Sequence, residues 1–160
     1  MQKFLHPFEP IIDINSKFLI LGTFPSLGSF KDSFYYANKR NQFWAILEIV
    51  FSTKLHDKDQ KLKFLKKQNI ALWDMIKSCK RKNSSDSNLK DITLHDIPYL
   101  LSQYPNINSI GFSGKKAYEL YHNNFHLDIK TTLLPSPSPA YAKMKLLQKV
   151  EKYREFFGKN

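Results

Sequence analysis

Hydrophobic positions alternate along this chain between short continuous runs, which predict buried strands, and longer stretches with a three- or four-residue repeat, which predict helices. The short runs are residues 17–21, 69–74, 108–114 and 129–134. The longer stretches are residues 42–51, 56–67, 91–104, 115–121 and 143–157. Strands that alternate with helices indicate the α/β class, with a mostly parallel sheet covered on both faces.

Three segments depart from this alternation. Residues 1–16 contain two prolines and are expected to form an extended lead-in that covers a sheet edge. Residues 77–90 are polar and are expected to form a solvated loop, although their basic and serine-rich composition also suits contact with phosphate. Pro98 lies within the helical stretch that follows, where it predicts a break or a kink.

The length of 160 residues suits a single domain over residues 1–160. No apolar run reaches the ~18 residues of a membrane span, and the N-terminus lacks the apolar core of a secretory signal. The single cysteine, Cys79, forbids an internal disulfide and a cysteine-rich metal site, and it indicates a reducing, cytoplasmic setting. We expect no metal, no other cofactor and no membrane partner, and a protein that acts as a monomer.

The charge of the chain is strongly unbalanced. Lys and Arg number 25 against 14 for Asp and Glu, which gives a net charge of +11. Such an excess favours polyanionic partners, nucleic acid first. A general lysine-rich bias of the source proteome would give the same excess, so charge alone does not identify the partner.

Two loops stand out because each follows the carboxyl end of a predicted strand, where open α/β sheets bind ligands. They are residues 22–26 and 134–139. Tyr35, Tyr36 and Asn41 follow the first loop, and their side chains could form a pocket for a flat, hydrogen-bonding ligand such as a nucleobase. The alternative is that Tyr35 is a core aromatic residue and that Asn41 only caps the next helix.

Four segments match a known family in order and spacing. They are LGTFPS at 21–26, YYA at 35–37, NQFW at 41–44 and LPSPSPA at 134–140, with weaker agreement from ALWD at 71–74 and SDS at 85–87. Together they resemble the uracil-DNA glycosylase superfamily, and within it the hypoxanthine (deoxyinosine) DNA glycosylases, near the mismatch-specific uracil glycosylases. The match runs from about residue 17 to residue 145, and YYA with NQFW is its most specific part.

This resemblance implies a three-layer α/β/α sandwich with a four-stranded sheet. It also implies that a deaminated base is flipped out of DNA and that its N-glycosidic bond is hydrolysed without a metal, which leaves an abasic site. The expected partner is double-stranded or single-stranded DNA that contains a damaged base.

The resemblance and the chemistry of the residues together suggest roles for single positions, and for Lys80, Arg81 and Lys82 the basis is the basic composition of their segment alone. Asn41 is the expected catalytic residue, and either Tyr36 or Tyr35 would stack on the base. The expected base pocket contains Gly22, Thr23, Phe24, Tyr35, Tyr36 and Ser136. The expected DNA contacts are Pro135, Ser136, Ser138, Tyr141, Lys80, Arg81, Lys82, Ser85 and Ser87. Tyr141 or Met144 would fill the gap that the flipped base leaves in the stack.

Departures from the family pattern bear on the substrate. Phe24 stands where uracil enzymes have the Asp or Asn that positions water, and Leu134 stands where they have a histidine that helps hold the base. Lys39 replaces a proline shortly before the asparagine. These differences favour hypoxanthine over uracil, with Asp32 as a rival for positioning the water. A mismatch-directed uracil or thymine glycosylase and a catalytically silent DNA-binding domain are the alternatives.

Overall fold

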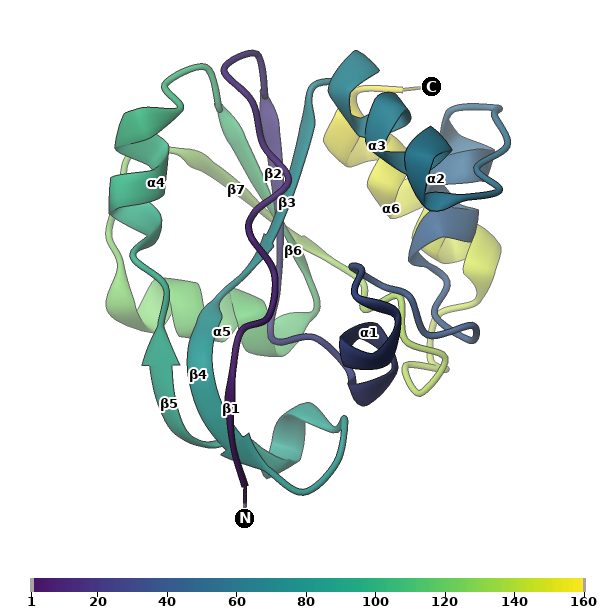
Figure 1. The fold of residues 1–160 in the computed structure, drawn as a ribbon. Coiled ribbons are helices and arrows are strands. Elements are labelled where there is room, and N and C mark those ends of the chain that lie inside the picture. Colours follow the sequence, from purple (N-terminus) through teal and green to yellow (C-terminus); the bar gives the residue numbers. More distant parts are fainter. Residues whose placement is uncertain (1, 160) are drawn as a thin grey trace.

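A four-stranded parallel sheet forms the centre of the computed structural model, which describes residues 2–159 (Figure 1). Met1 and Asn160, which the expected lead-in and domain range include, lie outside the described residues. The strands lie in the order β3 (Ile70–Asp74), β2 (Phe18–Gly22), β6 (Ser109–Ser113) and β7 (Lys130–Leu134). All neighbours pair in parallel, so the four expected strands and their direction are confirmed.

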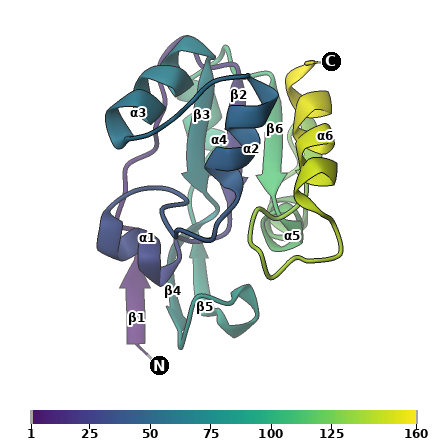
Figure 2. The ribbon, with the colours of Figure 1, turned by 90° about the vertical axis from the view of Figure 1, so that its right-hand side faces the viewer.

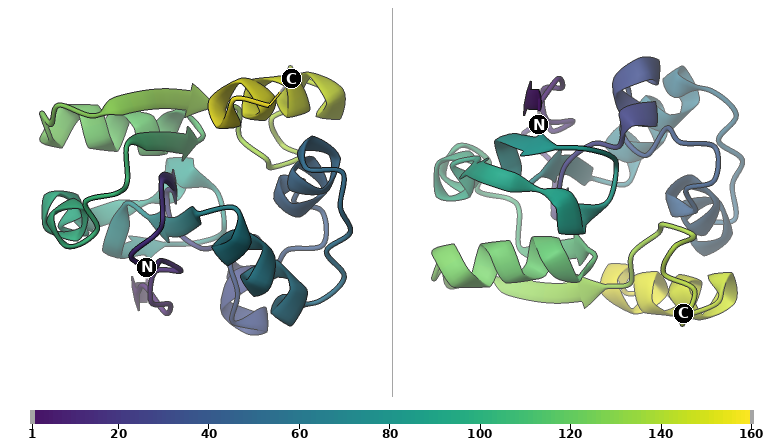
Figure 3. Two further views of the ribbon diagram at one scale, coloured as in Figure 1. Left: turned by 90° about the horizontal axis from the view of Figure 1, so that it is seen from above. Right: turned by 90° about the horizontal axis from the view of Figure 1, so that it is seen from below.

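Helices cover both faces of this sheet, which confirms the three-layer α/β/α arrangement (Figure 3). One face carries α2 (Phe43–Val50), α3 (Lys58–Lys67) and α6 (Leu146–Phe157), and the other carries α4 (Ile97–Gln103) and α5 (Lys115–Asn124). Successive residues of a strand point to opposite faces. In β2, Ile20 therefore joins the first core, whereas Leu19 and Leu21 join the second.

A second, antiparallel sheet was not expected from the sequence. It consists of β1 (Gln2–Leu5), β4 (Ile76–Arg81) and β5 (Lys90–Leu94), in the order β1-β4-β5. The prediction of a solvated loop over residues 77–90 is thus wrong for its first part. Ile76 and Ser78 are buried while Lys77 is exposed, a half-buried alternation that the polar composition hides.

The expected helix over residues 91–104 is also shorter than the pattern predicts. Its first residues belong to β5, and α4 begins only at Ile97. The Asp96 carboxylate caps this helix by accepting a hydrogen bond from the N–H of Tyr99 at 3.0 Å. Pro98 lies in the first turn, where backbone N–H groups have no partner within the helix and the missing N–H of a proline costs nothing. It therefore marks the start of the helix and not a break.

The lead-in covers a sheet edge as expected. The N–H of Ile11 donates to the carbonyl of Leu72 and the N–H of Leu72 donates to the carbonyl of Ile11, both at 2.9 Å. This single antiparallel bridge protects the outer edge of β3. No helix in the described part of the chain is long and apolar enough to cross a membrane.

The carboxyl ends of the parallel strands all face the same part of the molecule. Figure 2 shows the arrows of β3 and β6 pointing toward the end where α1 (Leu27–Asp32) and the small sheet lie. The first turn of α1 is closed by Ser26, whose Oγ accepts a hydrogen bond from the N–H of Ser29 at 3.1 Å. The segments that follow the strand ends therefore gather around one space.

Candidate active site

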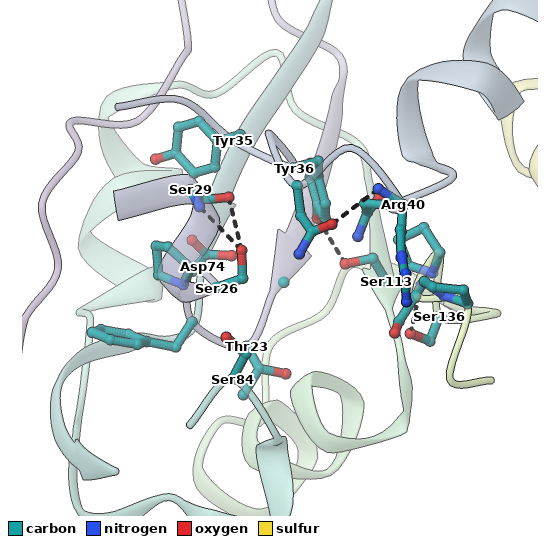
Figure 4. A pocket seen from close by; sticks show the side chains of 18 residues that line it. Thr23, Ser26, Ser29, Tyr35, Tyr36, Arg40, Asp74, Ser84, Ser113 and Ser136 are labelled. Atoms are coloured by element: carbon teal, nitrogen blue, oxygen red, sulfur yellow. Dashed lines mark hydrogen bonds between the residues drawn. The ribbon is translucent and has the colours of Figure 1, made fainter. Parts of the chain in front are cut away.

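A cavity of about 240 Å³ opens at the carboxyl ends of β2, β3 and β6 (Figure 4). Its walls come from these strand ends, from the segment after α1 and from the proline-rich loop after β7. The lining residues are Gly22, Thr23, Phe24, Pro25, Ser26, Ser29, Tyr35, Tyr36, Asn38, Arg40, Asn41, Asp74, Ser84, Ser113, Ser136, Pro137, Ser138 and Pro139. The expected catalytic asparagine and all six residues of the expected base pocket are therefore in one place.

Gly22 leaves the floor of this cavity open. A Cβ at this position would collide with Oδ1 of Asp74. It would also stand 3.1 Å from the hydroxyl of Tyr36 and 3.3 Å from Oγ of Ser113. A glycine is needed here because three polar side chains from different segments approach the backbone at this point.

Tyr36 is fixed from two sides. Its φ of 53° places the backbone in the left-handed region, which bulky residues rarely adopt. Its hydroxyl shares a 2.7 Å hydrogen bond with Oγ of Ser113 (Figure 4), and its ring stacks on Phe43 with centroids 3.9 Å apart and 15° between the planes. A rigid aromatic ring in the wall of a cavity suits stacking on a flat base.

Tyr35 is bound more tightly to the interior. Its side chain is 3% exposed, its hydroxyl donates to the carbonyl of Glu9 at 2.9 Å, and burial raises the pKa of that hydroxyl. Its own carbonyl accepts a hydrogen bond from Nε1 of Trp44 at 3.0 Å. The core role that was the alternative for Tyr35 therefore fits its surroundings, and Tyr36 is the more exposed of the two tyrosines.

Asn41 lies at the start of α2 and lines the cavity. Its Oδ1 accepts a hydrogen bond from the N–H of Phe43 at 2.9 Å, and its own N–H donates to the carbonyl of Asn38 at 2.9 Å. The expected cap is thus present in a modified form, since Gln42 occupies the formal cap position. With Oδ1 engaged by the helix, the Nδ2 amide hydrogens are the part of Asn41 suited to a ligand.

A buried lysine joins the two walls of the cavity. Nζ of Lys149, in α6, donates to Oε1 of Gln42 at 2.8 Å and to the carbonyl of Ser138 at 3.1 Å. The N–H of Gln42 donates to the carbonyl of Pro137 at 2.8 Å. Lys149 is 1% exposed, and this burial lowers the pKa of its amine. The proline-rich loop is therefore held against the residue next to Asn41.

The sequence reasoning missed Asp74 as a residue of the site. It ends β3, lines the cavity with a side chain that is 6% exposed, and accepts a 2.7 Å hydrogen bond at Oδ2 from Nε2 of His6. Nδ1 of His95 lies 2.8 Å from the Asp74 carbonyl, so that nitrogen must carry a proton, and burial lowers the pKa of His95 to about 4. Among the side chains that the structure describes, which exclude that of Asp86, no group of His, Cys, Asp and Glu is arranged to hold a metal ion.

Arg81 does not lie on the surface that the sequence suggested. It is 3% exposed, and its Nη1 donates to the carbonyl of Pro25. Its guanidinium lies 4.9 Å from the ring centroid of Phe24 and 5.2 Å from those of Phe4 and Phe30. Contact with phosphate does not fit this burial. Arg81 supports the loop of residues 22–26 from within.

The rest of the polar segment after β4 remains at the surface. Lys80 forms a 3.3 Å ion pair with Asp91, and Ser84 accepts a hydrogen bond from the N–H of Leu27 at 3.0 Å as it reaches the cavity. Three expected DNA contacts here are exposed: Lys82, Ser85 and Ser87. This segment thus brings Lys82 and several exposed serines next to the mouth of the cavity.

The proline-rich loop divides into buried and accessible residues. Pro135 is buried, and its carbonyl accepts a hydrogen bond from the hydroxyl of Tyr153 at 3.3 Å, so a direct DNA contact does not fit its position. Ser136 and Ser138 line the cavity. Tyr141 is 37% exposed, which keeps its ring accessible as the expected wedge.

Asp32, the expected rival for positioning water, is exposed and is not part of the cavity lining. The carboxylate in the cavity is that of Asp74. Its signal in the sequence was an acidic residue at the end of a short apolar run. Pro25, Ser26, Pro137 and Pro139 also line the cavity and belong to the two loops expected to bind a ligand, whereas Ser29, Asn38, Arg40, Ser84 and Ser113 were not expected.

The protein is an α/β/α sandwich with a cavity at the carboxyl ends of its parallel strands, the place where open sheets bind ligands. Residues 9–158 match the model of the family described as the uracil DNA glycosylase superfamily. The chain belongs to this superfamily, which confirms the resemblance found in its sequence.

Individual relatives agree with this assignment. The chain is 36% identical to the hypoxanthine DNA glycosylase of Methanosarcina acetivorans over 135 residues, and 33% identical to that of Methanosarcina barkeri over 135 residues. In both cases the match covers 83% of this chain and 85% of the relative. The solution NMR structure of a proposed uracil DNA glycosylase from Methanosarcina acetivorans superposes with a TM-score of 0.83 at 32% identity, over 94% of this chain and 95% of that one.

Proposed function

We propose that this protein is a monofunctional DNA glycosylase that removes hypoxanthine from DNA. It flips the deaminated base into the cavity and hydrolyses the N-glycosidic bond, which leaves an abasic site. The observation that carries the proposal is the meeting of Asn41, Tyr36 and the strand-end loop of residues 22–26 around one base-sized cavity. The names of the two archaeal relatives support hypoxanthine as the base.

Asn41 is the proposed catalytic residue. Loss of the base builds negative charge on the leaving group, and a donor held in place before the reaction stabilises such charge. Nδ2 of Asn41 can supply this donor, because the Oδ1 atom is anchored by the N–H of Phe43. Phe24 cannot take this role, since its buried ring packs among other rings and carries no polar atom.

The base is proposed to stack on Tyr36, whose ring is already supported by Phe43 on one side. Stacking on a fixed aromatic ring holds a flipped base with little loss of side-chain entropy. The base-edge contacts would come from the strand-end loop and from Ser136.

The proposed DNA surface surrounds the mouth of the cavity. It combines Lys80 near the end of β4 and the exposed segment after this strand with the proline-rich loop, and it excludes Arg81 and Pro135 because both are buried. Its residues are Lys80, Lys82, Ser85, Ser87, Ser136, Ser138 and Tyr141. The net charge of +11 supports attraction to the DNA backbone. We expect a monomer that accepts double-stranded or single-stranded DNA.

A second candidate is a uracil or thymine glycosylase directed at mismatches. The structural relative proposed to be a uracil DNA glycosylase supports it. A hydrogen-bonding pocket that holds a purine also has room for a smaller pyrimidine, so shape alone does not separate the two.

A set of labelled duplexes, each with one hypoxanthine, uracil, xanthine or mismatched thymine, tests the proposal. Alkali converts each abasic product into a strand break. We expect the hypoxanthine strand to be cut first, and purified Asn41→Ala protein serves as the control for a contaminating glycosylase. Binding without any alkali-labile product would identify a silent DNA-binding protein, and preferential cutting at uracil or thymine would favour the second candidate.

A further inference from the structure

Asp74 presents a carboxylate oxygen to the cavity that nothing in the described chain binds. Its Oδ2 accepts the hydrogen bond from His6, whereas none of the hydrogen bonds found among the described side chains reaches Oδ1. Oδ1 lies directly beside Gly22, at the floor of the cavity. The Asp74 side chain is 6% exposed, so a base that fills the cavity and displaces water from Oδ1 is favoured when it brings an N–H to this point.

We propose that Oδ1 of Asp74 accepts a hydrogen bond from the protonated ring nitrogen of the flipped base and thereby excludes adenine. This inference rests on the proposed glycosylase function. Hypoxanthine carries a hydrogen on N1, whereas N1 of adenine carries a lone pair. A carboxylate attracts the first and repels the second, because an ionised carboxylate only accepts hydrogen bonds.

The contact recognises N1, which gains a hydrogen when deamination converts the C6 amine of adenine to a carbonyl. Adenine is the normal base from which hypoxanthine arises, and an enzyme for hypoxanthine must leave a large excess of adenine untouched. A site that hydrogen-bonds a substrate N–H rejects an analogue without it, because the buried group of the site is then left unpaired. Uracil and thymine also carry a ring N–H, so Asp74 selects against adenine and not among deaminated bases.

His6 is a positioning residue for this contact. Its Nε2–H donates to Oδ2 of Asp74, which turns Oδ1 toward the cavity. Its Nδ1 has main-chain partners for either charge state, since the N–H of Phe8 lies at 3.2 Å and the carbonyl of Phe8 at 2.9 Å. Nε2 therefore keeps its proton whether the ring is neutral or charged, and Asp74 remains an acceptor toward the base.

The competing explanation is that the His6–Asp74 pair only tethers the lead-in to β3. Two matched substrates distinguish this structural role from a contact with the base. The experiment measures single-turnover excision of hypoxanthine and of unsubstituted purine, which lacks the N1 hydrogen, from identical oligonucleotides. Asp74→Asn is close to isosteric. In this variant His6 holds the amide oxygen, so the amide NH₂ faces the base and suits an unprotonated N1.

We expect Asp74→Asn to lower the rate for hypoxanthine relative to that for purine by roughly 10- to 100-fold, the range of one hydrogen bond to a charged group. Asp59→Asn is the matched control, because this carboxylate is 72% exposed on α3 and pairs only with Lys63. Its rates for both bases should equal those of the unaltered protein. An equal loss for both bases in Asp74→Asn would identify a tether and overturn the inference.

A second variant tests His6 separately. His6→Ala should reduce the hypoxanthine-to-purine ratio, and His6→Gln, which keeps a donor, should restore part of it. An unchanged ratio in His6→Ala would overturn its positioning role.

One measurement needs no variant. Free hypoxanthine should inhibit the unaltered protein at least 10-fold more strongly than free purine, and equal inhibition would overturn the Asp74 contact. If the unaltered protein excises no base at all, the proposed function fails. If it excises hypoxanthine but the hypoxanthine-to-purine rate ratio is unchanged in Asp74→Asn, only the present inference fails.

Discussion

Removal of the Asn41 carboxamide should slow hypoxanthine excision strongly while the protein stays folded. The side chain has two separable parts in this structure. Its Oδ1 accepts the N–H of Phe43 at 2.9 Å and so stabilises the start of α2, while Nδ2 is available to the cavity. The variants Asn41→Ala and Asn41→Asp test these parts independently.

The expected magnitudes differ between stability and rate. Loss of the hydrogen bond to Phe43 should lower the free energy of unfolding by about 1 kcal/mol, which is small beside the ~5–15 kcal/mol of an ordinary domain. Loss of a preorganised donor to a developing negative charge typically lowers the rate by ~10²–10³. Asn41→Ala should therefore be well folded and slower by that factor.

Asn41→Asp keeps an acceptor for the N–H of Phe43 but replaces the amide donor with a negative charge. We expect it to unfold at nearly the temperature of the unaltered protein and to excise hypoxanthine as poorly as Asn41→Ala. The assay is single-turnover cleavage of a labelled duplex with enzyme in excess, next to thermal unfolding. Substantial activity in Asn41→Asp would show that the side chain positions water, and unaltered activity in Asn41→Ala would move the chemistry elsewhere, with Asp74 the next residue to test.

Three further predictions concern the ring, the fold and the charge. Tyr36→Ala should lose excision activity because it loses base stacking worth roughly 1–3 kcal/mol. Tyr36→Phe should keep most of the activity although it loses the hydrogen bond to Ser113, and single-turnover rates of both variants test this. The pKa of His95 is lowered to about 4 in the folded protein from 6.5, so the unfolded chain binds more protons between these values. The contribution of neutral His95 to the free energy of unfolding is therefore complete above pH 6.5 and falls by about 3 kcal/mol as the pH drops to 4. Denaturant unfolding at several pH values should show that His95→Gln lacks this pH-dependent loss. DNA affinity should decrease linearly on a log–log plot against salt, with a shallower slope for Lys82→Gln than for the unaltered protein, and a flat plot would argue against DNA as the partner.

The sequence allowed the sheet and its pocket to be predicted because short apolar runs and strand-end loops follow from local pattern. Asn41 and Tyr36 follow such a loop in the chain, and both line the cavity. Arg81 was misplaced because a basic residue in a polar segment looks solvated, whereas aromatic rings from distant segments enclose it. Asp74 was overlooked because its partner, His6, lies 68 residues away in the chain and no local pattern links them. Pairings of this kind depend on tertiary contact and leave no periodic signal.

The buried amine of Lys149 has a practical consequence for following the protein at work. Amine-reactive labels modify a neutral, accessible lysine, and this one is 1% exposed beneath the proline-rich loop. Its labelling therefore reports how often that loop separates from Gln42. Mass spectrometry of the labelled peptide, compared with that of the exposed Lys63, would measure how fast the pocket walls open without a change to the sequence.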